Sequence, residues 1–212
     1  MDAHLATLPN GGQTTMGNNW AAGDIMYRDL NNDGKIDWGN STYDDLGDMK
    51  VIGNNTPRYM FGLNFGLDYK GIDVSVFFQG IMKRDYFTSS SDFWGASSLW
   101  SSTFYEQHMD YFRNDENHPL GLNLDGYYPR PVFDSSKNRH AQTRYLLNAA
   151  YIRLKNLSIG YTLPQEWVNK LKLQNLRVYV TGENLWTGTG LTDLFDPETI
   201  STDPAEIGRA HV

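Results

Sequence analysis

Side-chain oxygens recur along the stretch DLNNDGKID, where the sequence could hold a metal ion. Asp29, Asn31, Asp33 and Asp37 fall at positions one, three, five and nine, the Lys35 carbonyl stands at seven, and a glycine stands sixth. This spacing wraps oxygen ligands around Ca²⁺ in calcium-binding loops. The stretch therefore predicts a structural calcium site with Asp29, Asn31, Asp33, Lys35 and Asp37 as ligands.

A calcium sensor of the EF-hand type does not fit this stretch. Its loop needs a glutamate at position twelve, where Asn40 stands, and a helix on each side, where the flanking residues indicate extended chain and loop. Two interpretations remain. Asp44 or Asp45 supplies the missing carboxylate to a site of millimolar affinity, or the stretch is an Asx-rich turn without metal.

A second group of candidate residues is aromatic. Trp94, Trp100 and Tyr105 are the candidate ligand contacts, because exposed rings can stack on sugars and anchor a partner protein. They belong to a larger set in the same stretch: Phe93, Trp94, Trp100, Phe104, Tyr105, Tyr111 and Phe112. The alternatives are that these rings pack on one another to order a loop, or lie at a membrane interface.

Catalysis has little support in the sequence. His108, His118 and His140 lack metal-ligand spacing and are predicted to be surface residues. The carboxylates of NDENHP lie in a loop, whereas a pair acting on a glycosidic bond is held about 5–9 Å apart in a cleft. The sequence therefore contains no motif that supports a hydrolase.

Composition narrows the class of protein. The 212 residues suffice for one large or two small domains, and the net charge of −7 with scattered Lys and Arg argues against nucleic acid as a partner. Because the chain has no cysteine, it has no disulfides, thiol chemistry or zinc–thiolate sites. No apolar run approaches the roughly 20 residues of a membrane-spanning helix. The first residues do not resemble a signal peptide, so either the protein is cytosolic or Met1 is not the natural start.

Four segments show the two-residue period of β-strands. In YMFGLNFGLDY (59–69) every odd position is apolar, over about the length of a tilted membrane-spanning strand. A tight turn at Lys70-Gly71 leads to a second strand, 72–80, and further strands are predicted at 151–163 and 175–186. The apolar phase changes at Lys155-Asn156, which indicates a β-bulge. A shorter strand is predicted at DIMYRD (24–29).

The connections between these strands alternate in length. A two-residue turn is followed by a stretch with little periodicity, 82–148, and then by a ten-residue turn beginning at Pro164, for which one or two helical turns are predicted. Outer-membrane barrels have short periplasmic turns and long outside loops. The predicted fold class is therefore all-β: a segment of an antiparallel transmembrane β-barrel with long extracellular loops, the calcium-like loop among them. Four strands cannot close a barrel, so the chain is expected to be a fragment.

Five segments together resemble the SusC/RagA family of TonB-dependent outer-membrane transporters. They follow in the family's order: GDIMYRDLNNDGKID (23–37), 51–80, YYPR (127–130), AAYIRLKNLSIGYTLP (149–164) with LRVYVTGENLW (176–186), and DPE (196–198). The resemblance covers roughly residues 20–200. It implies the C-terminal part of a 22-stranded barrel in the outer membrane of a Gram-negative bacterium.

The resemblance also implies function and partners. Such transporters import glycans or peptides beneath a SusD-type lipoprotein lid and are driven by TonB–ExbB–ExbD, with outer-membrane lipid around the barrel. The plug, the TonB box and the closing strand of the family have no counterpart in the sequence. Residues 1–205 are accordingly expected to be barrel, and 206–212, EIGRAHV, resemble a translated sequencing adapter.

A different class of protein also fits part of the pattern. A secreted, calcium-stabilised β-sandwich that binds carbohydrate would explain the calcium-like loop and the aromatic residues. It predicts shorter strands and an apolar face covered by a second sheet, and it does not account for the 82–148 stretch.

Overall fold

The computed structural model describes residues 13–95, 98–100, 102–170, 172–200 and 210–211. The chain divides into two compact units. The loop unit comprises 1–54, 86–146 and 203–212, and the strand unit comprises 55–85 and 147–202.

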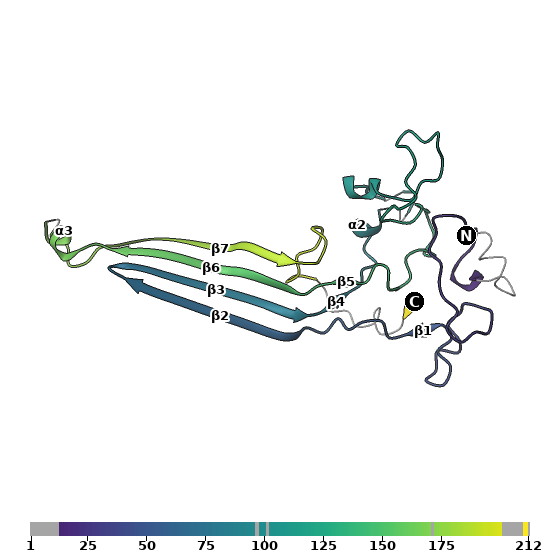
Figure 1. Ribbon diagram of the computed structural model, residues 1–212, viewed down its shortest axis with the longest axis horizontal. Helices are drawn as coiled ribbons and strands as arrows, with labels where there is room; N and C mark the ends of the chain where they lie inside the picture. Colours follow the sequence, from purple (N-terminus) through teal and green to yellow (C-terminus); the bar gives the residue numbers. More distant parts are fainter. Residues whose placement is uncertain (1–12, 96–97, 101, 171, 201–209, 212) are drawn as a thin grey trace. The chain divides into compact units, whose positions relative to one another are not determined.

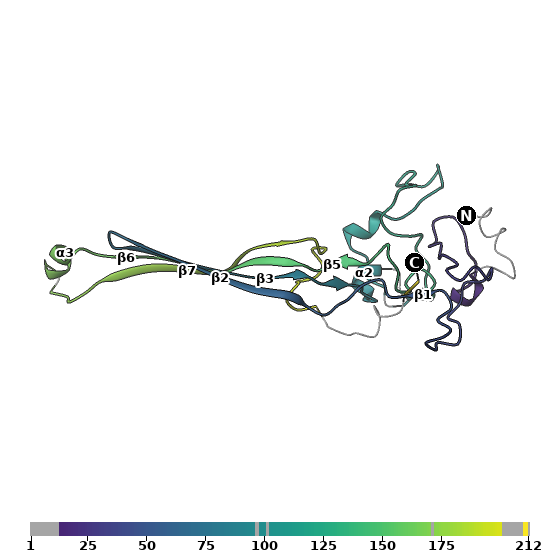
Figure 2. The same ribbon diagram turned by 60° about the horizontal axis from the view of Figure 1, so that its bottom comes forward.

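The strand unit is one antiparallel sheet of four strands in the order β2-β3-β6-β7. The strands are β2 (Arg58–Tyr69), β3 (Ile72–Lys83), β6 (Tyr151–Thr162) and β7 (Arg177–Thr189). Each has 12 or 13 residues, about twice the usual strand length of 5–6. The twist of the sheet is visible in Figure 2. All four predicted long strands are confirmed, with ends shifted by up to three residues.

The connections at one end of the sheet are short, as predicted. Lys70 and Gly71 both have positive φ, 49° and 86°, which suits the two-residue hairpin turn between β2 and β3. The helix α3 (Gln165–Lys170) follows Pro164 in the connection from β6 to β7. The predicted bulge is also present, because the pairing of β6 with both neighbours skips Lys155.

The register gathers the apolar side chains on one face of the sheet. Leu67 of β2 lies opposite Val74 of β3, which in turn lies opposite Ile159 of β6 and, beyond it, Val180 of β7. We call this the apolar face, and it remains exposed at 65% for Leu67 and 75% for Val180. The sandwich alternative requires shorter strands and a covered apolar face, and neither is found in the strand unit.

Two glycines of the sheet differ in what a side chain would meet. A Cβ on Gly80 would lie 2.3 Å from the Tyr151 carbonyl oxygen and 2.6 Å from the Phe61 ring, whereas a Cβ on Gly66 meets nothing within 4 Å. We expect Gly80→Ala to destabilise the sheet by about 1–3 kcal/mol through overpacking, and Gly66→Ala to leave stability unchanged. Thermal unfolding of the whole receptor compares the two variants. Equal melting temperatures would contradict the packing described.

The loop unit contains little regular structure. Its helical elements are the 3₁₀ turns η2 (Thr14–Met16) and η3 (Glu106–Met109) and the single-turn helix α2 (Ser91–Trp94). The backbone of β1 (Met49–Lys50) pairs with that of β8 (Ala210–His211). The short strands β4 (Asp85–Tyr86) and β5 (Leu147–Asn148) lie where the chain passes between units. None of the helices in the described ranges meets the length and hydropathy that a membrane span requires.

The strand predicted at DIMYRD (24–29) is wrong. This segment pairs with side-chain amides instead of with another strand. The Gln13 amide accepts from the Tyr27 N–H and donates to the Ile25 carbonyl, and the Asn138 amide oxygen accepts from the Ile25 N–H. The two side chains thus form the hydrogen bonds that a neighbouring strand would otherwise form with this backbone. The sequence periodicity of such an extended segment is the same as that of a strand, so it could not reveal the difference.

The predicted artefactual tail, 206–212, lies outside the described residues apart from the backbone of β8. Its origin stays a prediction, as does the assignment of 1–205 to a barrel.

Candidate functional site

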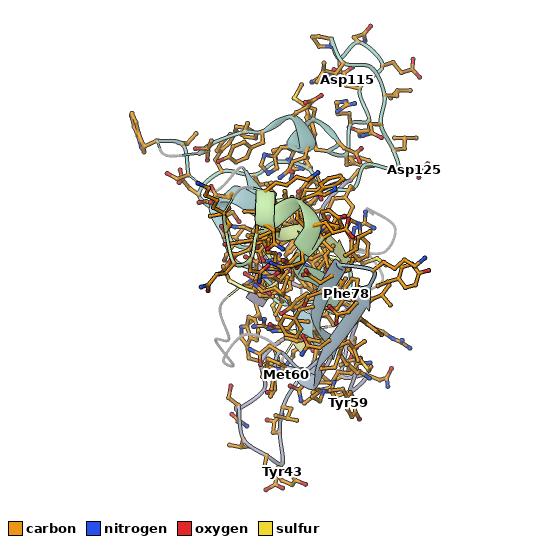
Figure 3. The ribbon with its side chains drawn as sticks, turned by 90° about the vertical axis from the view of Figure 1, so that its left-hand side faces the viewer. Tyr43, Tyr59, Met60, Phe78, Asp115 and Asp125 are labelled. Atoms are coloured by element: carbon orange, nitrogen blue, oxygen red, sulfur yellow. The ribbon has the colours of Figure 1, made fainter. Side chains whose placement is uncertain are left out.

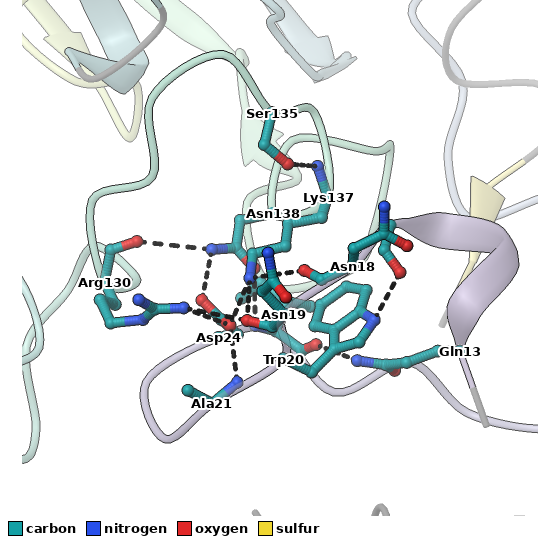
Figure 4. Close-up of polar contacts among 12 residues, drawn as sticks. Gln13, Asn18, Asn19, Trp20, Ala21, Asp24, Arg130, Ser135, Lys137 and Asn138 are labelled. Atoms are coloured by element: carbon teal, nitrogen blue, oxygen red, sulfur yellow. Dashed lines mark hydrogen bonds and ion pairs between the residues drawn. The ribbon is translucent and has the colours of Figure 1, made fainter. Parts of the chain in front are cut away.

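A buried ionic network joins distant segments of the loop unit around Asp24 (Figure 4). The Asp24 carboxylate accepts from the Lys137 ammonium at 2.8 Å, from the Arg130 guanidinium at 2.9 Å and from the Asn138 amide at 3.0 Å. The Lys137 ammonium also donates to the carbonyls of Asn18 and Asn19. The network therefore fixes the segment before the calcium-like loop against residues 130–138.

The network is fully removed from water at its centre. The Asp24 side chain is 0% exposed and the Lys137 side chain 1%. Burial alone raises the pKa of the Asp24 carboxyl, but the hydrogen bonds from its charged and amide partners outweigh burial, so its pKa lies below the ordinary 3.8. Asp24 is therefore ionised wherever the loop unit is folded at neutral pH.

This lowered pKa predicts acid sensitivity of the loop unit. Because the pKa of Asp24 is lower in the folded than in the unfolded chain, its contribution is complete above about pH 4 and is lost as pH falls further. We expect the protection factors of the Ile25 and Tyr27 amides, the ratios of intrinsic to observed hydrogen-exchange rate, to fall below that pH. Asp24→Asn, which carries no titrating group at this position, should show a shallower pH dependence. Identical profiles for both proteins would contradict the assignment.

The five predicted calcium ligands lie in a loop closed by its own side chains. Asp29 accepts from the N–H groups of Asn32 and Gly34, and Asn31, Asp33 and Asp37 each accept from the N–H two residues further on. The loop is anchored by Asp48, fully buried, whose carboxylate accepts from the N–H groups of Leu30 and Asp37. Within the described ranges, no three or more His, Asp or Glu side chains gather closely enough to hold a metal ion.

Calcium binding at this loop therefore stays a prediction, to be tested by titration. We expect half-maximal protection of the loop amides from hydrogen exchange at millimolar Ca²⁺, and no calcium effect in the Asp29→Ala, Asp33→Ala variant. The control is Asp134→Ala, an exposed carboxylate outside the loop. Protection that is identical in chelator and in excess Ca²⁺ would contradict calcium binding and favour the Asx-turn interpretation.

The aromatic set is split between core and surface. Phe93 and Trp94 are buried and pack edge-to-face on Tyr145, and the Trp94 indole donates to the Thr88 carbonyl. Trp100, by contrast, is 94% exposed and Tyr105 is 44% exposed. Of the three candidate ligand contacts, Trp100 and Tyr105 are thus accessible, whereas Trp94 helps to order the loop unit. Tyr43, at the end of the loop drawn lowest in Figure 3, is as exposed as Trp100.

One histidine differs from its prediction. His108 is buried and is not a surface residue. Its two ring nitrogens tolerate burial because each has a backbone hydrogen-bond partner. Nδ1 accepts from the Tyr105 N–H and Nε2 donates to the Phe93 carbonyl, which defines a neutral ring. It therefore joins η3 to α2 within the loop unit.

A second ionic cluster lies on the polar face of the sheet, the face opposite the apolar one. Arg153 of β6 donates to both oxygens of Asp196, at 3.0 and 2.9 Å, and to Glu198 at 2.7 Å. The Lys155 ammonium lies 3.0 Å from Glu198. Further along this face, Arg177 of β7 pairs with Asp73 of β3.

Neither ionic cluster was predicted from the sequence, although a signal for both was present. Asp24 and Arg130 belong to two of the segments that carry the family resemblance, GDIMYRD and YYPR. Likewise Arg153 lies in AAYIRLKNLSIGYTLP and pairs with DPE. Opposite charges in separate motifs of one resemblance were thus the available hint that these segments meet.

Comparison with known proteins identifies the relationship. Over 191 residues, 90% of this chain, the sequence is 31% identical to TonB-dependent receptor P3 of Formosa agariphila (strain DSM 15362 / KCTC 12365 / LMG 23005 / KMM 3901 / M-2Alg 35-1). TonB-dependent receptor P26 of the same organism is 26% identical over 176 residues, 83% of the chain. The chain is a relative of TonB-dependent receptors. The predicted resemblance is thereby confirmed, although no family model matches the chain.

Solved structures agree with this receptor relationship at the level of fold. The RagAB peptide importer in the open-open state matches with a TM-score of 0.51 at 21% identity, over 80% of this chain and 18% of that one. A structure of the RagAB peptide transporter matches with a TM-score of 0.51 at 20% identity, over 76% of this chain and 17% of that one. The chain spans 17% of receptor P3 and 16% of receptor P26, and so corresponds to a part of such receptors.

Proposed function

We propose that the chain forms part of the wall and outer loops of a TonB-dependent importer in the outer membrane of a Gram-negative bacterium. One observation carries the proposal: four paired strands of 12–13 residues present a continuous apolar face that is left exposed, in a relative of TonB-dependent receptors. A membrane-spanning β-strand needs about 9–11 residues. Lipid is the natural cover for such a face.

The edges of the sheet support a larger barrel. Within the described residues, β2 and β7 each pair with one neighbour only, so each presents a long unpaired edge. Closure of a barrel with further strands removes such edges. The family resemblance supplies the expected number, 22 strands in all.

The two faces of each strand then have different roles. The apolar face, with Phe65 and Val180, meets lipid, and the polar face, with Asn64 and Ser158, lines the interior. The short connections at Lys70-Gly71 and α3 lie on the periplasmic side. Chain order then puts the long connection between β3 and β6 on the outside, and the Asp24 network holds segments of the loop unit to one another.

Substrate and partners follow from the resemblance and belong to the same proposal. The substrate is a glycan or a peptide, and RagAB, whose fold this chain shares in part, is described as a peptide importer. A SusD-type lipoprotein covers the outside loops, and TonB–ExbB–ExbD drives transport through other parts of the receptor. Trp100 and Tyr105 are the exposed rings that we expect to contact substrate or lid.

Single cysteines test the placement of the two faces. This chain has none of its own, and any cysteines elsewhere in the receptor are first replaced. Ser158→Cys reports on the polar face and Val180→Cys on the apolar face, in the whole receptor within the outer membrane. We expect a water-soluble maleimide to label Ser158→Cys faster, and a lipid-soluble quencher to reach a fluorophore only at position 180. Equal labelling of both positions would contradict the barrel wall.

A further inference from the structure

The segment after β7 returns to the sheet and is fastened there. Residues 196–200, which we call the strap, carry Asp196 and Glu198, the two carboxylates bound by Arg153. Lys155 binds Glu198 as well, and the Tyr151 hydroxyl donates to it at 3.4 Å. Because the partners come from the polar side of β6, the strap lies over the polar face.

A second arginine holds the backbone of the strap. Arg84, which directly follows β3, is 3% exposed and donates to the carbonyls of Pro197 and Ile200. It also donates to the Asn55 carbonyl, before β2. The strap is thereby tied to chain segments flanking two other strands, through its backbone as well as through its side chains.

The strap covers only one end of the polar face. Tyr151 and Arg153, at the β6 end far from the short turns, are 6% and 7% exposed. On the same face but nearer the short turns, Tyr179 of β7 is 61% exposed. The apolar residues that alternate with Tyr151 and Arg153 on the other face of β6 are only partly buried. We therefore attribute the low exposure of Tyr151 and Arg153 to the strap.

We propose that the strap is a fixed barrier at the outside end of the polar face, which limits the entry of solutes, and that Arg153 is its positioning residue. This inference rests on the proposed function, in which the polar face lines the interior of a barrel. Two carboxylates held by a buried guanidinium make charge-assisted hydrogen bonds, the strong kind in proteins. These contacts therefore hold the strap on the polar face.

The test measures access to Ser158→Cys from outside, in the whole receptor in the outer membrane. The probe is a water-soluble maleimide too large to cross the membrane. Arg153→Met removes the two ion pairs of the strap with Arg153 and leaves the pair of Lys155 with Glu198. The double variant Asp196→Asn, Glu198→Gln removes all three ion pairs. The control is Arg177→Met, which breaks the other arginine–carboxylate pair of the same face, between β3 and β7.

We expect the labelling rate to rise at least about tenfold in both strap variants, because each removes more than one charged contact, and to stay unchanged in the control. If the Arg153→Met receptor does not reach the membrane, the double variant provides the test. Unchanged labelling in the strap variants, or an equal rise in the control, would overturn the barrier. Equal labelling of Ser158→Cys and Val180→Cys in the otherwise native receptor would instead remove the proposed barrel wall, and the barrier with it.

Discussion

Replacing Asp24 with alanine is expected to lower the free energy of unfolding of the loop unit by about 3–5 kcal/mol, the usual cost of removing one partner of a buried ion pair. The reason is the environment of Lys137, whose ammonium would remain buried with two backbone carbonyls as its only polar contacts in the network. Arg130 would lose its carboxylate partner as well.

The measurement is hydrogen exchange of the whole receptor in detergent, followed at the Ile25 and Tyr27 amides, which the Gln13 and Asn138 side chains protect. The matched control is Asp44→Ala, an exposed carboxylate of the same unit, for which we expect a change within about 0.5 kcal/mol. If Asp24→Ala and Asp44→Ala exchange at the same rate, the network does not hold the loop unit together.

An arginine placed on the apolar face is also expected to lower the folding stability of the receptor strongly. Phe65 lies in the middle of β2, opposite Val76, and is 58% exposed on that face. If lipid covers it, Phe65→Arg should cost about 2–4 kcal/mol, the penalty for Arg near the bilayer midplane. Gly66→Arg should cost little, because the adjacent position faces the interior and a Cβ there meets no atom within 4 Å.

The comparison is made by urea-dependent folding of the whole receptor into lipid vesicles. The adjacent position is a sharp control, since both variants add the same side chain to the same strand. A similar penalty at both positions would mean that the two faces of β2 have the same surroundings. A penalty at Gly66 alone would reverse the assignment of the faces.

The strands were predictable because the pattern that specifies them is local. Alternation from Tyr59 to Tyr69 identifies β2 to within one residue, and the phase change at Lys155 correctly locates the bulge. The long loop was recognised from its lack of periodicity. Strand pairing adds the register, which places Leu67, Val74, Ile159 and Val180 on one face.

The contacts within the loop unit were not predictable in this way. Asp24 and Lys137 are 113 positions apart, and no periodic pattern links two charges at that separation. The same limit explains the error at residues 24–29, where the partners of the extended backbone are two side chains, Gln13 and Asn138. It also explains His108, whose burial depends on the backbone of Phe93.

In the proposed importer, the apolar face of the sheet meets lipid. The most direct measurement is the structure of the whole receptor in a lipid nanodisc, determined by cryo-electron microscopy. We expect lipid density against Phe65, Ile159 and Val180, with further strands paired to β2 and β7. A second sheet or a soluble domain packed over those three residues would contradict it.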